Sequence, residues 1–261
     1  MEPDDARLLA RSVAGLTLDD HVLALRPGPD RAADPVSAGA IDARLAAIAH
    51  ALRDAGRLGP WRGESLPVLA ADGAVLGRIE RATMRVLGLR TIAVHLLGRV
   101  AGARLWVQRR APDKAVDPGR LDSLAGGLVG LDARAGDGRM EALDEAMRRE
   151  AAEEAGIDTG VAMRRIDGPA LRIVRPLAEG YMVEDLVGFE ADFDTGFMPR
   201  NRDGEVTGFE CLDAGALVER IGRGEFTLAG SLLILRRLRQ SGHAGSGATG
   251  EEPRTPPAGP G

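Results

Sequence analysis

The sequence has one cysteine, Cys211, one lysine, Lys114, and no apolar run that approaches the length of a membrane span. A single cysteine excludes an internal disulfide and favours a reducing compartment. The first residues include Glu2, Asp4 and Asp5, which are unlike the basic start of a secretory signal peptide. We therefore expect a cytoplasmic protein.

An excess of basic residues is also missing. The chain has 34 Lys and Arg against 39 Asp and Glu, so the formal net charge is −5. This balance lacks the electrostatic footprint of a nucleic-acid-binding protein. The 44% hydrophobic and 28% charged content is typical of globular proteins, and 261 residues suit either a single large domain or two compact ones. We expect a small-molecule partner rather than nucleic acid or membrane, and a homodimer is compatible with the sequence.

Turn residues divide the first hundred residues. The Pro- and Asp-rich stretch 26–40 predicts a loop, and apolar residues at helical spacing predict a helix over Ile41–Leu52 that ends near Gly56. Asp72-Gly73 predicts a hairpin turn between strands at 66–69 and 74–79. A second glycine-containing turn, 98–102, separates strands expected at 91–97 and 103–108.

The second half alternates strands and helices. We expect a long loop over 110–138, a helix over 141–155 with a left-handed glycine cap at Gly156, and further strands and helices. The strands are at 171–174, 182–189 and 206–212, and the helices are at 214–221 and 228–238. The tail 241–261 has almost nothing apolar to bury, so we expect disorder there. Strands flanked by helices predict an α/β sandwich.

Carboxylates crowd one face of the helix predicted at 141–155. Residues three and four apart share a helix face, so Glu150, Glu153 and Glu154 would project together. Taken alone, such glutamates are usually a solvated face of the helix; the alternative is that divalent cations such as Mg²⁺ occupy the space between these like charges. Arg149 lies four residues before Glu153 and can pair with it. The opposite face, Leu143, Ala146 and Met147, can pack on a sheet.

This segment resembles the Nudix box, G-x5-E-x7-R-E-U-x-E-E-x-G-U. Two positions depart from it: Ala151 replaces a bulkier aliphatic residue, and Ala135 stands where the first glycine is expected. Gly126-Gly127 are the expected counterparts of that glycine, with an insertion of about Val129 to Arg139. The positions that match in register are Glu141, Arg149, Glu150, Glu153, Glu154, Gly156 and Ile157.

The resemblance extends to the thiamin pyrophosphokinase-related subgroup of Nudix proteins, over roughly Leu45 to Leu238. It implies a Nudix-type α/β/α sandwich with a mixed sheet, preceded by a smaller α+β domain. The expected regions are an N-terminal helical or loop region at 1–40, an α+β domain at 41–90, the Nudix domain at 91–240 and a tail at 241–261. The segments that carry the resemblance are Trp61–Glu64, Ile79–Ala82, Ala93–Gly98, Arg109, Lys114, Pro118-Gly119, Leu121-Asp122, Ala125–Gly127, Pro199–Val206 and Phe209.

The resemblance also implies roles. The activity would be hydrolysis of thiamin diphosphate, or of its damaged analogues, to the monophosphate and phosphate. Two roles stay open at this stage: Glu205 is either an additional base or ligand or a plain turn residue, and Lys114 is either a phosphate-binding charge or a chance lysine. The implied metal site for Mg²⁺ (or Mn²⁺) is Glu150, Glu153, Glu154 and Gly127, the catalytic residues are Glu153, Glu154, Arg149 and Glu205, and the substrate-binding residues are Arg109, Lys114, Asp122 and Gly126.

Three alternatives remain. A nucleotide or coenzyme pyrophosphatase would share the metal site and differ only in the pocket. An enzyme similar to isopentenyl-diphosphate isomerase would need a cysteine before the box, and Cys211 follows it. A non-catalytic binding module would typically lack some of the box glutamates. Among isolated residues, His95 is more simply explained by packing, Trp61 and Tyr181 by burial in the core or by stacking on a ring, and Cys211 by a strand.

Overall fold

The computed structural model describes residues 1–20, 22–25, 38–101, 104–130, 139–158 and 160–242. The N-terminal region has its own apolar core, in which Leu9, Leu52, Leu66 and Ile79 are almost fully buried. Leu9 lies in the first helix, so residues before 41 share this core with those after it. Its elements are α1 (Pro3–Ser12), β1 (Leu16–Asp19), β2 (Val22–Leu25), α2 (Ala38–Asp54), β3 (Ser65–Leu69), β4 (Val75–Glu80) and α3 (Thr83–Leu87).

A mixed eight-stranded sheet forms the centre of the C-terminal region. Its main path runs β10-β11-β5-β6-β12, with β7 paired to β6, β8 to β5 and β9 to β11. The central β11 and β5 are parallel, and the other pairs are antiparallel. The strands are β5 (Arg90–Val100), β6 (Arg104–Arg110), β7 (Leu121–Asp122), β8 (Ala125–Leu128), β9 (Arg164–Arg165), β10 (Leu171–Leu177), β11 (Gly180–Phe193) and β12 (Val206–Leu212).

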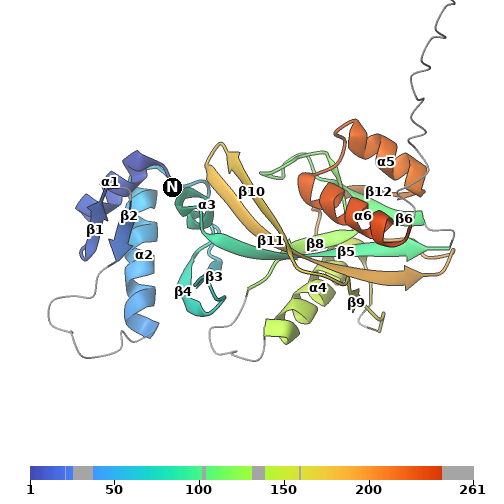
Figure 1. Cartoon of the computed structure of the whole chain (residues 1–261), viewed down its shortest axis with the longest axis horizontal. Helices are drawn as coiled ribbons and strands as arrows, with labels where there is room; N and C mark the ends of the chain where they lie inside the picture. The colour runs from blue at the N-terminus through green and yellow to red at the C-terminus, as the bar shows by residue number, and fades with distance from the viewer. Residues whose placement is uncertain (21, 26–37, 102–103, 131–138, 159, 243–261) are drawn as a thin grey trace, which may run out of the picture.

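Helices cover both faces of this sheet. Alternate residues of β5 point to opposite sides: Val94 packs toward α4 (Arg139–Ala155), whereas Leu97 packs toward α5 (Ala214–Gly222) and α6 (Leu228–Gln240). Figure 1 shows α4 on one side of the sheet and α5 and α6 on the other. This arrangement confirms the predicted α/β/α sandwich with a mixed sheet and a smaller α+β unit before it.

Most predicted elements are confirmed, including the helix at 41–52, both hairpins and the helix at 141–155. The expected loop at 110–138 is partly wrong, because β7 and β8 lie within it. β7 has only two residues and β8 contains two glycines, so neither sequence shows an alternating pattern, and pairing with β6 and β5 creates the strands. The helical or loop region expected at 1–40 contains the helix α1, whose bounds were not predicted although Pro3, Asp4 and Asp5 in its first turn are a helix-start signal. The strands β1 and β2 in the same region were not expected.

Two expectations fall on residues outside the described ones: most of the insertion, at 131–138, and most of the tail, at 243–261. The same holds for most of the predicted 26–40 loop, although its last residues, from Ala38, already belong to α2. None of the helices in the described portion of the chain is long and apolar enough to cross a membrane.

Candidate functional site

The helix α4 brings its glutamates to the sheet. Leu143, Met147 and Ala151 are buried against the sheet, which fixes the rotation of the helix about its axis. Gly156 ends the helix with φ 66°, and a Cβ there would lie 2.8 Å from the carbonyl oxygen of Arg200. The glycine is therefore required both for its left-handed conformation and for the close approach of the chain that carries Arg200.

Glu154 is the most deeply buried acid of the helix, at 1% exposure. One of its oxygens, Oε2, accepts hydrogen bonds from the Gln108 side chain at 3.0 Å and from the Gly126 backbone N–H at 2.8 Å. Burial raises the pKa of Glu154 to about 7, and those two hydrogen bonds oppose the shift. The other oxygen accepts no hydrogen bond from the described residues, so it remains available to a cation or water.

Glu150 explains the glycine at position 127. A Cβ on Gly127 would overlap the carboxylate of Glu150, so the glycine leaves room for this side chain to lie against β8. Burial raises the pKa of Glu150, and its largest opposing influence is Arg149. The expected pairing of Arg149 with Glu153 is wrong: Arg149 pairs with Glu150 at 2.8 Å. The Arg149 guanidinium turns toward β8, where it also contacts the Leu128 carbonyl.

A turn before β12 supplies two further acids. The Asn201 side chain accepts hydrogen bonds from the backbone N–H groups of Asp203 and Gly204, and the Glu205 N–H bonds to the Asp203 carboxylate at 2.8 Å. Carboxylate oxygens of Asp203 and Glu205 then lie with one of Glu154 within 4.8 Å of one another. Glu205 is thus both a turn residue and a member of an acidic cluster.

The membership of this cluster differs from the predicted set. Of the three box glutamates, Glu154 joins Asp203 and Glu205, while Glu150 lies against Gly127 and the side chain of Glu153 is exposed. Asp203 was not among the predicted site residues. The sequence nevertheless pointed to its neighbourhood, because Asp203 lies inside the segment Pro199–Val206 that carries the family resemblance.

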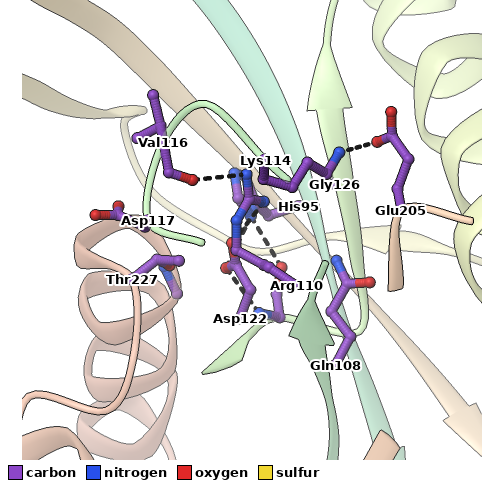
Figure 2. Close-up of polar contacts among 12 residues, drawn as sticks. His95, Gln108, Arg110, Lys114, Val116, Asp117, Asp122, Gly126, Glu205 and Thr227 are labelled. Atoms are coloured by element: carbon purple, nitrogen blue, oxygen red, sulfur yellow. Dashed lines mark hydrogen bonds and ion pairs between the residues drawn. The ribbon is translucent and has the colours of Figure 1, made fainter. Parts of the chain in front are cut away.

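Lys114 completes the cluster with a positive charge. Its ammonium pairs with the Glu205 carboxylate, as Figure 2 shows. Burial lowers the pKa of Lys114, and the charge of Glu154 is the largest influence in the opposite direction. The lone lysine of the chain therefore lies among the acids of the site, which favours the phosphate-binding interpretation over chance.

A cavity of about 520 Å³ opens next to these residues. Gly126, Gly127, Glu150, Glu153 and Glu205 form one side of its lining. The rest of the lining contains five arginines: Arg81, Arg85, Arg110, Arg149 and Arg175. Such a volume is within the usual range of small-molecule sites, and the lining combines these arginines with acids, among them Asp117, Asp122 and Glu184.

A second cavity, of about 610 Å³, shares some of that lining and lies between the N-terminal and C-terminal regions. Arg62, Leu66 and Met84 come from the N-terminal region, while Tyr181 and Met182 come from β11. The N-terminal region thus supplies a wall of the space that leads to the acidic cluster.

The inner wall of the first cavity is a polar network centred on Asp122. Its carboxylate accepts the Ser123 N–H at 2.8 Å and the Arg110 guanidinium at 3.5 Å, and Asp122 and Arg110 are labelled in Figure 2. The Ser123 hydroxyl is 2.8 Å from Nδ1 of His95. His95 is buried and hydrogen-bonded, as the packing interpretation predicts, although it also lines the cavity. Asp122 is engaged by these partners, so its place in the structure is that of a positioning residue.

Some predicted residues lie elsewhere. Arg109 pairs with Glu210 at 2.9 Å and with the Gly119 carbonyl, and it lines neither cavity. Burial of Trp61 in the core is a wrong expectation, because Trp61 is 40% exposed and stacks on His50. Tyr181 lines the outer cavity and donates to Glu2. Cys211 lies in β12, as predicted.

Comparisons with known proteins find similar sequences among Nudix hydrolases. Nudix hydrolase 20, chloroplastic, from Arabidopsis thaliana is 29% identical over 196 residues, which are 73% of this chain and 50% of the plant protein. A Nudix hydrolase from Deinococcus radiodurans is 27% identical over 180 residues, 69% of this chain and 96% of the relative. The chain spans about half the length of the plant relatives it matches. No family model matches.

The fold is also found among solved structures. The crystal structure of DR0079 from Deinococcus radiodurans superposes with a TM-score of 0.50 and 25% identity, covering 66% of this chain and 98% of that one. The named relatives and this likeness show that the chain is similar to Nudix hydrolases and has the Nudix fold.

Proposed function

We propose that this protein is a member of the Nudix hydrolase superfamily and a Mg²⁺-dependent hydrolase that cleaves a diphosphate linkage. The observation that carries the proposal is the convergence of Glu154, Asp203 and Glu205 within 4.8 Å, at the mouth of an arginine-lined cavity. Acids gathered beside cations suit a ligand that binds metal and carries negative charge of its own. A non-catalytic module would not need this arrangement.

The donor set fits a hard divalent cation. Carboxylate oxygens are the ligands that Mg²⁺ and Mn²⁺ prefer, and Glu154 keeps one oxygen without a hydrogen bond from the described residues. Glu154, Asp203 and Glu205 would hold the metal, with Glu150 and Glu153 beside them. A bound metal supplies charge neutralisation on the diphosphate and a lowered pKa for water.

The chain's own residues then have separable tasks. The Gly126 N–H and Gln108 hold Glu154 at Oε2, which directs Oε1 toward the metal or the attacking water. Glu205 is our first choice to accept the proton of that water, because it lies on the exposed turn and its other neighbour is Lys114. Lys114 is placed to donate to a phosphate oxygen once substrate arrives. Attack at phosphorus, in line with the leaving oxygen, releases phosphate and the monophosphate.

For the substrate we propose thiamin diphosphate or its damaged analogues. The support is the ordered resemblance over Leu45 to Leu238, together with the cavity wall that the N-terminal region supplies. A nucleotide-derived diphosphate is the second candidate, because the arginine-lined cavity would accept its phosphates equally well. Both candidates use the same acidic cluster and differ only in what fills the outer cavity. The subgroup, the domain boundaries and the cytoplasmic location also belong to this proposal.

A phosphate-release screen tests both the hydrolase activity and the choice of substrate. The full chain would be assayed with Mg²⁺, with Mn²⁺ and with chelator against thiamin diphosphate, its oxidised analogues, nucleoside triphosphates, ADP-ribose and dinucleotides. Because some diphosphate cleavages release no free phosphate, products would also be separated by chromatography. Metal-dependent cleavage of the thiamin compounds supports the full proposal. Cleavage of nucleotides alone removes the thiamin assignment, and no cleavage of any of these removes the enzyme assignment.

A further inference from the structure

Glu184 is a carboxylate in the cavity that the proposed reaction does not use. It lies on β11, opposite Thr91 of β5, and lines both the inner and the outer cavity. Burial raises the pKa of Glu184, which shows that the cost of removing this carboxylate from water is only partly offset. Among the described residues it has no hydrogen bond or ion pair.

The basic groups nearest to Glu184 are already engaged. His95 is hydrogen-bonded to Ser123, Arg85 pairs with Glu179, and Arg175 pairs with Asp117 at 2.6 Å. Each of them influences Glu184 through charge alone. The carboxylate therefore faces the cavity with its hydrogen-bonding capacity unused.

Apolar side chains as well as arginines line the two cavities together with Glu184. Met182 precedes it on the same face of the strand, and Leu128 and Val116 line both cavities with it. Lys114 lies at the acidic cluster, where the phosphates are proposed to bind. A ligand that spans this space would have its phosphates near Lys114 and its organic moiety near Met182 and Glu184.

We propose that Glu184 is a specificity-determining residue that binds a nitrogen-containing ring through an N–H donor or a positive charge on that ring. This inference rests on the proposed function, and it names the chemical class of the group attached to the diphosphate. A half-buried carboxylate without a side-chain partner among the described residues is paired when such a ring enters, whereas a purely alkyl or carbonyl-rich group leaves it unpaired. Thiamin compounds belong to the favoured class.

The same strand provides a matched control. Glu190 lies six residues further along β11 on the same face, lines neither cavity, and is paired with Arg237 at 2.6 Å. Glu184→Gln removes a charge that has no partner, whereas Glu190→Gln breaks an established ion pair. We expect Glu184→Gln to raise the Tm of the ligand-free protein and Glu190→Gln to lower it.

Kinetics give the decisive readout. With thiamin diphosphate, Glu184→Gln should lower kcat/KM about 10- to 100-fold, mainly through KM, because a hydrogen bond to a charged group is lost. With geranyl diphosphate, which has no N–H and no positive charge, kcat/KM should stay unchanged or rise. Glu190→Gln should behave like wild type with both substrates. A kcat loss that is equal for every substrate would instead assign Glu184 to the chemical step and overturn the proposal.

Binding separates this inference from the proposed function. Calorimetry with thiamin monophosphate needs no turnover, so it tests recognition even if no diphosphate is cleaved. Weaker binding by Glu184→Gln than by Glu190→Gln supports recognition of the ring. Equal binding by both variants and wild type refutes the role of Glu184 and leaves the hydrolase assignment untouched. If wild type neither cleaves nor binds any nitrogen-ring compound, both proposals fail.

Discussion

Substitutions of Gly126, Gly127 and Gly130 test the geometry of the proposed metal site without changing its charge. Gly127→Ala places a methyl group where the Glu150 carboxylate lies. That carboxylate is the end of a flexible side chain, so the side chain can rotate away at a cost of about 0.5–1.5 kcal/mol. Replacing glycine stabilises by about 0.4–1 kcal/mol through the unfolded chain. The two effects nearly cancel, so the free energy of unfolding should change by less than about 1 kcal/mol.

Activity should respond very differently. Displacing Glu150 shifts an acid beside the proposed metal by more than a methyl radius, and misplacement on the order of 1 Å costs about 100-fold in rate. We expect kcat for diphosphate hydrolysis to fall about 100-fold in Gly127→Ala, with a higher Mg²⁺ concentration required for half-maximal rate.

The adjacent glycines serve as controls. In Gly130→Ala the methyl group meets no atom of the described residues within 4 Å, so both stability and activity should match wild type. In Gly126→Ala it meets the Val94 carbonyl oxygen at 2.9 Å, and that backbone cannot move without disturbing β5, so stability should fall by about 1–3 kcal/mol. Denaturant unfolding and steady-state phosphate release measure the two quantities. Wild-type kcat in Gly127→Ala, or a stability loss equal to that of Gly126→Ala, would refute the reasoning.

Three further predictions concern the same site. The pKa of Glu154 is about 7 in the folded protein against 4.5 in the unfolded chain, so the folded state binds this proton more tightly. The free energy of unfolding of the metal-free protein should therefore fall by about 3 kcal/mol as the pH rises through that interval. Thermal melts at several pH values measure this dependence, and Glu154→Gln should abolish most of it. Lys114→Ala should raise KM more than Glu153→Gln does, whereas Glu153→Gln should mainly lower kcat, and equal effects on both parameters would contradict these roles. Gly156→Ala should lower the free energy of unfolding by more than about 1 kcal/mol, because the alanine would have a strained positive φ and its methyl group would meet the Arg200 carbonyl oxygen. An unchanged unfolding midpoint would contradict this.

Periodicity and local geometry made much of the fold predictable. The helix α4 was predictable because Leu143, Ala146 and Met147 recur at helical spacing and Gly156 supplies its cap. The hairpin of β3 and β4 was predictable because Asp72-Gly73 is a local turn signal. The strand β8 was not, since Ala-Gly-Gly-Leu has no pattern of its own and exists as a strand only through pairing with β5.

Part of the candidate site was also predictable from the sequence, and part was not. The amino-acid order alone determined that Glu150, Glu153 and Glu154 lie on consecutive turns of one helix, because helix geometry is local. Only the tertiary structure decided which acids meet: Asp203 and Glu205 come from a turn much later in the chain, and strand pairing of β12 with β6 brings them to Glu154. The lack of a partner for Glu184 among the described residues is likewise a property of the packed molecule, because a carboxylate becomes costly to leave unpaired only when the surrounding chain removes it from water.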